Sequence, residues 1–185
     1  MSLSAHKIHG PKGIGALYLR KGLGLNPLTS GGSQEGKNRP GTENVPGIAG
    51  FGAALSLIQS RRVEFEERSA EMRDSFWATL KDEPGIYPLV SPESCVPYIV
   101  SVRVEGCSSE TLLHFLEREG VWVSSGSACH GSAEPTHVLK ALGHKGDPGS
   151  FRASLALDSP EDSLERLARA LVSVVPIVRK VSASR

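Results

Sequence analysis

The feature that most constrains the fold of this chain is a lysine that lies almost at its start, in the segment Ser4–Tyr18. Lys7 has small and polar neighbours and leads into a glycine-punctuated apolar run. The glycines let the backbone turn and approach other groups closely, and Pro11 stiffens the first turn. We therefore expect a tight turn that presents Lys7, with residues 1–3 as the end of the strand that precedes it.

A lysine in such a turn has a specific chemistry available to it. Its amine condenses with an aldehyde to form a Schiff base, and pyridoxal phosphate is the cofactor that most often uses this reaction. Ser4 and His6, both just before Lys7, offer an O–H and an N–H to a phosphate anion. A lysine beside a histidine is more often part of a solvated basic patch, so the other motifs decide between the two interpretations.

Composition excludes several classes of protein. With 185 residues and 39% hydrophobic content, the chain can bury the core of one domain, or of one small domain plus a piece of another. A net charge of +1 gives no electrostatic footprint for nucleic acid or a membrane surface. No apolar run is long enough to span a membrane and no leader is recognised, so we expect a cytoplasmic protein, or one of an organelle matrix.

A glycine-rich segment follows the lysine turn. Residues 31–47 combine glycines, hydroxyls and basic groups, and include the string R-P-G-T-E-N-V-P-G that contains Thr42. Such a composition suits a loop that wraps an anion. The alternative is a flexible surface loop.

One of three cysteines has the setting of a reactive thiol. Cys129 ends the string S-S-G-S-A-C, which follows an expected strand at 121–123 and forms a small polar loop. Only a thiolate is a useful nucleophile, and neighbouring His130 can raise its population. Cys95 and Cys107 have no neighbouring base, so we expect small buried or surface residues there. The odd number and the spacing favour neither a disulfide framework nor a metal site.

An arginine among apolar neighbours marks the last motif. We expect a strand over 150–155, in which Arg152 is the one charged residue. The arginine fork matches a carboxylate with two hydrogen bonds, so an anionic partner is expected.

Periodicity places these motifs in an alternating α/β chain. Two helical stretches, 46–58 and 63–81, are interpreted as one long connecting helix. The apolar residues that recur at helical spacing in the first stretch are Ile48, Phe51, Ala54, Leu55 and Ile58. A strand is predicted at 98–104, followed by a helix capped by Ser108 or Ser109 and ended by Gly120. A short helix is expected at 134–143, in which His137 is a cap or packing residue. A last helix is expected to start with Ser159 as its cap. Its predicted apolar face is Leu164, Leu167, Ala168, Leu171, Val172 and Val175.

Four strings in register carry a resemblance. S-A-H-K-I-H-G-P-K-G-I-G-A-L-Y, R-P-G-T-E-N-V-P-G, S-S-G-S-A-C and the R-x-S-L string at Arg152 together resemble the class V aminotransferase family, most closely its cysteine desulfurase branch of NifS-like and IscS-like proteins. The resemblance implies an α/β fold, the C-terminal part of a fold type I pyridoxal-phosphate transferase. Residues 1–46 are then a remnant of the large cofactor-binding domain, and residues 47–185 are the connecting helix and the small domain. Because the family lysine lies near mid-chain, the sequence is interpreted as a C-terminal half.

The resemblance also implies how the cofactor is held. Lys7 bonds pyridoxal 5'-phosphate, while Ser4 and His6 hold its phosphate. Thr42 reaches the phosphate of the partner subunit in a homodimer. Ser33 stands where a third glycine is usual, and residues 36–38 also depart from the family pattern, which affects the shape of this loop more than its role.

For the substrate, the resemblance implies that Arg152 holds the α-carboxylate of L-cysteine and that Cys129 takes its sulfur as a persulfide, leaving L-alanine. The sulfur then passes to an acceptor or iron–sulfur scaffold protein, for iron–sulfur cluster or tRNA thiolation pathways. The alternatives are a selenocysteine lyase, a non-catalytic truncated or split subunit that needs an N-terminal partner, and a simple transaminase, in which Cys129 has no purpose.

Overall fold

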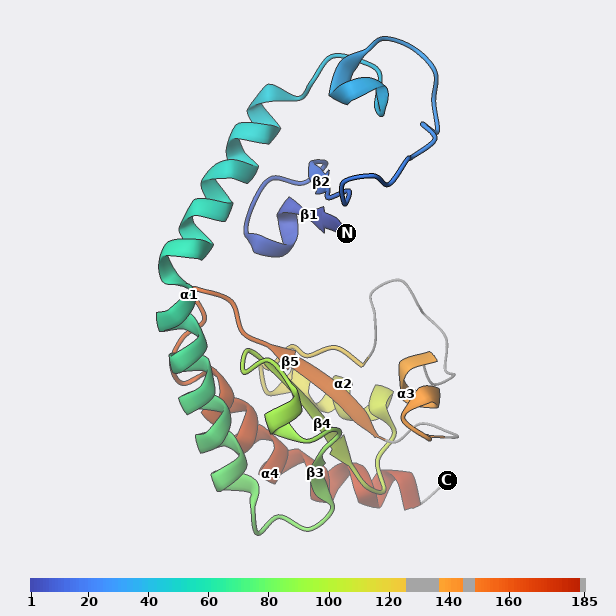
Figure 1. Ribbon diagram of the computed structural model, residues 1–185. Coiled ribbons are helices and arrows are strands. Elements are labelled where there is room, and N and C mark those ends of the chain that lie inside the picture. Colours follow the sequence, from blue (N-terminus) through green and yellow to red (C-terminus); the bar gives the residue numbers. More distant parts are fainter. Residues whose placement is uncertain (126–136, 145–148, 184–185) are drawn as a thin grey trace. The chain divides into compact units, whose positions relative to one another are not determined.

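The computed structural model describes residues 1–125, 137–144 and 149–183 (Figure 1). Contacts divide the chain into two compact units, an N-terminal unit (Met1–Arg62) and a C-terminal unit (Val63–Arg185), and each is described by itself. This division falls inside one long helix. The predicted boundary between family domains after residue 46 stays a prediction.

The N-terminal unit contains short elements joined by long loops. Strands β1 (Ser2–Ser4) and β2 (Gly15–Leu17) pair antiparallel, with Leu3 opposite Ala16. Between them lies the 3-10 helix η1 (Ala5–Ile8), and a second one, η2 (Gln34–Lys37), follows in the glycine-rich loop. The predicted strand end before Lys7 is therefore confirmed. The apolar run 15–20 after it was expected to form a buried strand, and this expectation is corrected: only Gly15–Leu17 pairs with β1, and that strand is exposed.

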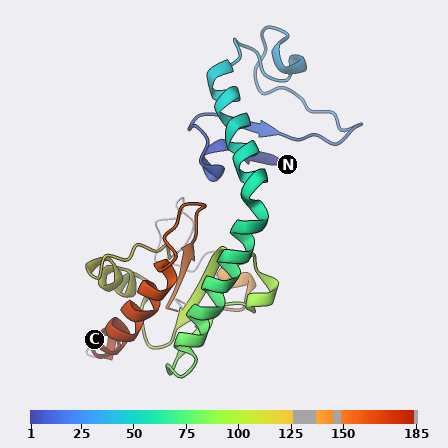
Figure 2. The same ribbon diagram turned by 90° about the vertical axis from the view of Figure 1, so that its left-hand side faces the viewer.

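One helix, α1 (Val45–Leu80), continues from the first unit into the second (Figure 2). It begins where the Gly47 N–H donates to Asn44 Oδ1 at 3.1 Å, with Pro46 in the first turn. Residues 53–80 contain neither glycine nor proline, so the two predicted helical stretches join into one helix, as the connecting-helix interpretation expected.

The first half of α1 buries only a narrow stripe. Phe51 and Ala54 are buried, as the periodicity predicted. Ile48 and Leu55 are exposed, which corrects the prediction that they belong to the same apolar face. The reason is geometric: Gly47, Phe51 and Ala54 follow one line of the helix, and the N-terminal unit covers only that line.

The C-terminal unit is built on an antiparallel sheet. Its strands β3 (Ile86–Pro88), β4 (Ile99–Val104) and β5 (Ser150–Ser154) lie in that order, with the 3-10 helix η3 (Pro92–Ser94) between β3 and β4. Alternate residues of β4 are buried, which is typical of a sheet with one face on a core and the other face open. The predicted strands at 98–104 and 150–155 are confirmed within a residue.

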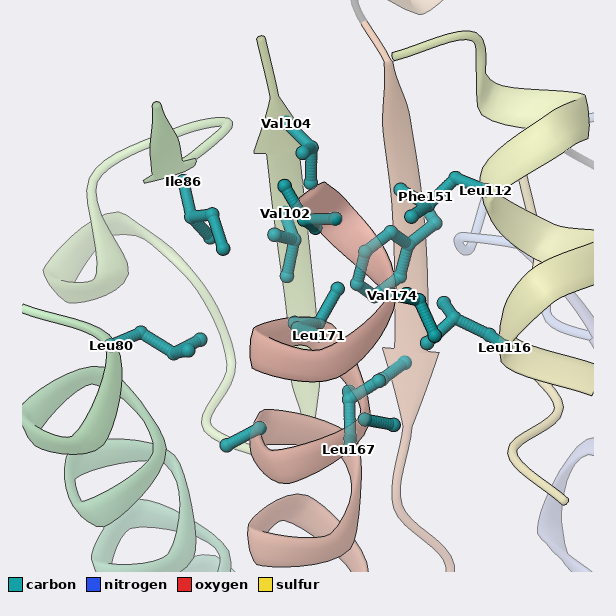
Figure 3. Close-up of a cluster of buried hydrophobic side chains, with 14 of the residues drawn as sticks. Leu80, Ile86, Val102, Val104, Leu112, Leu116, Phe151, Leu167, Leu171 and Val174 are labelled. Atoms are coloured by element: carbon teal, nitrogen blue, oxygen red, sulfur yellow. The ribbon is translucent and has the colours of Figure 1, made fainter. Parts of the chain in front are cut away.

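In the described part of the C-terminal unit, the helices α2 (Ser109–Arg118) and α3 (His137–Ala141) lie between β4 and β5, and α4 (Ser163–Ala183) follows β5. Ser108 caps α2, as predicted, by accepting a hydrogen bond from the Thr111 N–H at 3.2 Å. The core lies between one face of the sheet and the helices α1, α2 and α4 (Figure 3). Its labelled members are Leu80, Ile86, Val102, Val104, Leu112, Leu116, Phe151, Leu167, Leu171 and Val174.

Three predictions about this unit were wrong. Residues 121–123 form no strand; only Ser124 makes an isolated bridge, because the Val121 N–H still bonds back to the last turn of α2 at Leu116 O, 3.0 Å. Helix α4 starts at Ser163, since Ser159 Oγ accepts from the Ala156 N–H at 2.8 Å instead of capping the helix. Val172 is exposed on α4, while Val174 and Val178 join the core.

Among the residues that the structure describes, no helix is long and apolar enough to cross a membrane.

Candidate active site

The lysine turn is held by backbone hydrogen bonds rather than by side chains. The Ala5 N–H donates to Ile14 O at 3.1 Å, and the Gly10 N–H donates to Ala5 O at 2.9 Å. Ala5 itself is fully buried, and His9 ends η1 in the left-handed conformation with φ 64°. The backbone of the turn is therefore fixed at both ends around Lys7.

Ser4, His6 and Lys7 are exposed on this turn. Ser4 is the extended residue at which β1 ends, and His6 and Lys7 lie within η1. A hydroxyl, an imidazole and an ammonium group thus come from one short stretch of chain. The structure brings these three predicted residues together on one turn.

Two glycines make the turn possible. A Cβ on Gly15 would collide with the Leu3 carbonyl oxygen across the hairpin. A Cβ on Gly50 of α1 would lie 2.6 Å from Pro11 Cγ, so the loop after Lys7 packs directly on the helix backbone there. Glycine at both positions permits the close approach of the lysine segment to its neighbours.

The glycine-rich loop that carries Thr42 is shaped by Gln34 and by left-handed backbone. Gln34 Oε1 accepts from the Gly41 N–H at 3.2 Å, which closes the loop. Lys37 has φ 68°, beside Gly36 with φ 62°. Thr42 is exposed in a different loop of the same unit from Lys7. An open concavity of about 590 Å³ in this loop is lined by residues 27–33 and Lys37.

Arg152 lies on the open face of the sheet. It is exposed in β5, opposite Ser101 of β4, whereas its neighbours Phe151 and Ala153 are buried on the core face. On the other side of β5, the Arg152 N–H donates to Ser124 O at 2.7 Å and the Ser124 N–H donates to Arg152 O at 3.0 Å. The predicted strand with a single charged residue is confirmed.

Cys129 and His130 lie outside the described residues, so the structure gives no account of them. The described part of the same segment ends at Ser125. The Ser124 bridge nevertheless joins the start of the predicted cysteine loop to the arginine strand. Two motifs that are separate in the sequence thereby share one pair of backbone hydrogen bonds.

The two other cysteines agree with their predicted passive role. Cys107 is buried and Cys95 is half-buried. Burial raises the pKa of the Cys107 thiol, and the nearby Arg179 guanidinium partly opposes this increase. A raised pKa lowers the thiolate population, which makes Cys107 a poor nucleophile. His137 is the first residue of α3 and is exposed, so the structure does not support a packing role for it.

Sequence reasoning missed two features of this region, the partner of Ser124 and the position of Trp122. The signal for the second was present in V-W-V-S, because alternation places Trp122 and Ser124 on the same side of an extended segment. The bridge to Arg152 had no sequence signal of its own.

In the part of the chain that the structure describes, no three His, Cys, Asp or Glu side chains gather as they would around a metal ion.

The fold and these motifs define a class of protein. A family model described as aminotransferase class-V matches residues 1–167 of the chain. The chain therefore belongs to the class-V aminotransferase family, and the resemblance seen in the sequence is confirmed.

Individual relatives make the similarity more specific. The chain is 39% identical over 185 residues to cysteine desulfurase IscS of Methanosarcina thermophila, which covers 98% of this chain and 46% of that protein. It is 40% identical over 190 residues to cysteine desulfurase IscS of Dictyoglomus turgidum, which covers 98% of this chain and 47% of that protein.

Solved structures agree on the fold. A NifS-like protein superimposes with a TM-score of 0.82 at 31% identity, over 95% of this chain and 46% of that one. A NifS-like protein from Rickettsia africae gives a TM-score of 0.82 at 26% identity, over 95% and 47% of the two chains. The predicted α/β class is thus confirmed. The chain spans about half the length of the relatives it matches.

Enzymes of this family use pyridoxal phosphate, the cofactor that the sequence predicted. The exposed groups on the lysine turn fit such a molecule chemically. An amine meets its aldehyde, and a hydroxyl and an imidazole suit its phosphate.

Proposed function

We propose that this chain carries the lysine and the carboxylate-binding arginine of a pyridoxal-phosphate-dependent cysteine desulfurase. The observation that carries the proposal is the turn on which Ser4, His6 and Lys7 are exposed together. It occurs in a chain that is 39% identical, over 98% of its own residues, to a protein named cysteine desulfurase. The proposed reaction converts L-cysteine to L-alanine and leaves the sulfur on the enzyme.

In the proposed cofactor site, Lys7 Nζ bonds the cofactor aldehyde, and the Ser4 hydroxyl and His6 imidazole hold its phosphate. The fixed backbone of η1 supports this role, because a turn ordered before binding loses little conformational freedom on binding. Thr42 lies in a separate loop of the same unit. We propose that it reaches the cofactor phosphate of a second subunit, which makes the working protein a homodimer.

In the proposed substrate site, the Arg152 guanidinium binds the α-carboxylate of cysteine with two parallel hydrogen bonds and so fixes its orientation. The open face of β5 supports this role, since it presents Arg152 to solvent while its neighbours hold the strand in the core. The backbone bridge to Ser124 ties the start of the cysteine loop to the same strand.

The chemistry is a transfer of one sulfur atom. When bound, pyridoxal phosphate serves as an electron sink for the substrate α-carbon. Once the substrate amine has replaced it on the cofactor aldehyde, the Lys7 amine is free to take the α-proton and later to return a proton to the carbon skeleton. The Cys129 thiolate attacks the substrate sulfur, so that an S–S bond forms as the C–S bond breaks, and the products are alanine and a persulfide on Cys129. A sulfur acceptor or iron–sulfur scaffold protein then removes the sulfur.

The choice between cysteine and selenocysteine as substrate, and the cellular location, also belong to this proposal. A selenocysteine lyase would use the same residues, and the described side chains do not favour it over the desulfurase. The cytoplasmic location expected from the sequence also stays a prediction.

The first test is a titration of the purified chain with pyridoxal phosphate, followed by borohydride reduction and mapping of the labelled lysine. We expect stoichiometric labelling of Lys7 and its loss in Lys7→Arg. Lys12, an exposed lysine of the same segment, offers the matched control, because Lys12→Arg should leave the labelling unchanged. Labelling scattered over many lysines would contradict the proposed role of Lys7.

A second candidate function is a subunit that is catalytic only with a complementing chain. It is favoured by the sparse core of the N-terminal unit, where many large apolar side chains are exposed, and by the half-length match to relatives. Release of alanine and sulfide from cysteine by the purified chain alone would argue against it. In an active preparation, Cys129→Ala should abolish persulfide formation, whereas a transaminase would barely change.

A further inference from the structure

The glycine-rich loop before α1 has no hydrophobic core to fix its shape. In residues 31–44, all of which the structure describes, no side chain is buried. Two residues of this stretch, Gln34 and Pro40, are half-buried, and the others are exposed. Because burial of apolar surface is the usual source of order in a folded chain, the shape of this loop depends on polar contacts and on close packing against its backbone.

The side chain of Gln34 joins two segments of this loop. Its Oε1 accepts a hydrogen bond from the Gly41 N–H at 3.2 Å, and the two residues are seven positions apart in the chain. Asn38, by contrast, makes a local contact, because its Nδ2 donates to Glu35 O at 3.1 Å. Gln34 therefore holds the backbone at the residue directly before Thr42, whereas Asn38 acts at the end of η2.

Two glycines provide the space for this arrangement. A Cβ on Gly32 would collide with Gln34 Oε1 and would lie 3.1 Å from Gln34 Cδ. A Cβ on Gly31 would lie 2.7 Å from Pro40 Cβ. The two half-buried residues of the loop therefore pack directly on these glycines. As a result, the backbone that leads to the threonine is held at two successive residues, by packing at Pro40 and by the hydrogen bond at Gly41.

We propose that Gln34 is a positioning residue for Thr42, and that it holds the threonine in place for the phosphate group of the cofactor. The inference rests on the proposed function, in which Thr42 reaches the cofactor phosphate of a second subunit, and it names the residue that prepares this contact. A loop with several glycines loses much conformational freedom when a ligand orders it. Because Gln34 orders the loop before the ligand arrives, that loss does not weaken binding of the phosphate.

Backbone dynamics of the full chain without cofactor test whether Gln34 orders the loop. Gln34→Met keeps the length of the side chain and removes the oxygen acceptor, so the NMR order parameters of the Gly41 and Thr42 amides should fall from about 0.85 to below about 0.6. Gln34→Glu retains an acceptor oxygen and should preserve both values. Asn38→Ala is the matched control, because it removes a local hydrogen bond of the same loop and should leave both amides ordered. Unchanged order parameters in Gln34→Met would overturn the inference.

Two aldehydes that differ by one phosphate test whether this order serves the cofactor. Pyridoxal phosphate and pyridoxal carry the same aldehyde for a lysine amine, and only the first has a phosphate. Gln34→Met should weaken binding of pyridoxal phosphate by about fivefold to tenfold, the loss typical of one hydrogen bond, and should leave pyridoxal binding unchanged. Thr42→Val should give the same pattern. The two substitutions together should bind no more weakly than Thr42→Val alone, because Gln34 acts through Thr42. Weaker binding of both aldehydes, or additive losses, would indicate a general structural role and would overturn the proposal.

Labelling of Lys7 separates this inference from the proposed function. Borohydride reduction should trap both aldehydes on Lys7 in the unaltered chain, so an absence of Lys7 labelling by either one would refute the proposed cofactor site and the phosphate role that rests on it. Labelling of Lys7 by both aldehydes with equal affinities would instead overturn the phosphate role of Gln34 and Thr42 alone. The order parameters are measured without cofactor, so they test the ordering of the loop by Gln34 whatever the result of the labelling.

Discussion

The two units of the chain differ sharply in how much apolar surface they bury. In the C-terminal unit, one continuous cluster joins the sheet to α1, α2 and α4. In the N-terminal unit, the buried hydrophobic side chains are Ala5, Phe51 and Ala54, whereas leucines such as Leu17 and Leu28 are exposed. Burial of apolar area is the main source of stability, so the two units should respond very differently to similar substitutions.

The difference also separates two ways of holding a functional residue. Arg152 is positioned by a strand whose neighbours are fixed in the core. Lys7 is positioned by backbone hydrogen bonds within one turn and by contact of Pro11 with α1. The arginine strand is therefore stabilised by the core of its own unit, while the lysine turn has little core of its own to stabilise it.

The largest effect is expected from a matched pair of leucine substitutions. Leu171 is completely buried in α4, and Leu28 is fully exposed just before the glycine-rich segment. Leu171→Ala should lower the free energy of unfolding by about 2–5 kcal/mol, because it removes buried methyl groups and leaves a cavity. Leu28→Ala should change it by less than about 0.5 kcal/mol. Urea denaturation followed by circular dichroism measures both.

Circular dichroism is suitable for that pair because α1 has residues in both units, so unfolding of either unit changes the helical signal. A loss of unfolding free energy in Leu28→Ala as large as in Leu171→Ala would contradict the expected difference between the two units. It would mean that Leu28 is covered in solution by a partner or by another part of the protein.

Glycine substitutions sharpen the comparison at the backbone level. Gly149 and Gly13 both have positive φ, 64° and 80°. A Cβ on Gly149 would collide with Val104 O and lie 2.6 Å from Cys107 O, whereas one on Gly13 meets nothing within 4 Å. Gly149→Ala should therefore lower the free energy of unfolding by about 2–4 kcal/mol. Gly13→Ala should lower it by at most about 1–2 kcal/mol, from the left-handed backbone alone.

Thermal unfolding followed by circular dichroism distinguishes the two glycine variants. Because Val104 N–H donates to Gly149 O at 2.8 Å, Gly149→Ala should also increase amide exchange at Val104. If Gly149→Ala and Gly13→Ala lowered the free energy of unfolding equally, the backbone conformation and not the packing around Gly149 would account for the whole loss of stability.

The same contrast explains which parts of the fold the sequence predicts. Strands and helices of the C-terminal unit were predicted well where side chains alternate or recur around a buried face, as at Val100, Val102 and Val104. Ser108 was identified as a cap because its hydroxyl acts on its own helix. These signals are local, so they survive without knowledge of the tertiary structure.

Predictions from the sequence were wrong where a distant or competing hydrogen-bond or packing partner determines the local structure. Ser159 has the sequence of a cap, but its hydroxyl bonds to Ala156 N and the helix begins later. Ile48 and Leu55 have helical apolar spacing, yet no element of their unit covers them. The bridge between Ser124 and Arg152 joins segments far apart in the sequence, and neither residue type signals the pairing.

For the candidate site, the sequence names residues whose roles stay predictions, and it does not indicate how those residues lie in space. Ser4, His6 and Lys7 were named from one short string, and their common exposure on a single turn agrees with it. The exposure of Trp122 was not predicted, because the alternation in V-W-V-S shows which residues share a side of the segment but not which side packs on the core.

The smallest effect in the comparison concerns helix caps. Ser108 accepts from the Thr111 N–H at 3.2 Å and caps α2 of the C-terminal unit. Ser33 has the equivalent position before η2, but within residues 1–125 its side chain makes no capping hydrogen bond. Ser108→Ala should lower the free energy of unfolding by about 1 kcal/mol, and Ser33→Ala should change it by less than about 0.5 kcal/mol.

Ser108→Asp provides the rescue control for this pair. An aspartate accepts the same hydrogen bond and places a negative charge at the positive end of the α2 dipole, so it should restore most of the stability lost in Ser108→Ala. Urea denaturation at low salt is the measurement, because the charge contribution is screened at high salt. An aspartate variant as unstable as the alanine variant would show that the Ser108 side chain stabilises the unit by packing, and the cap would then not distinguish the C-terminal unit from the N-terminal one.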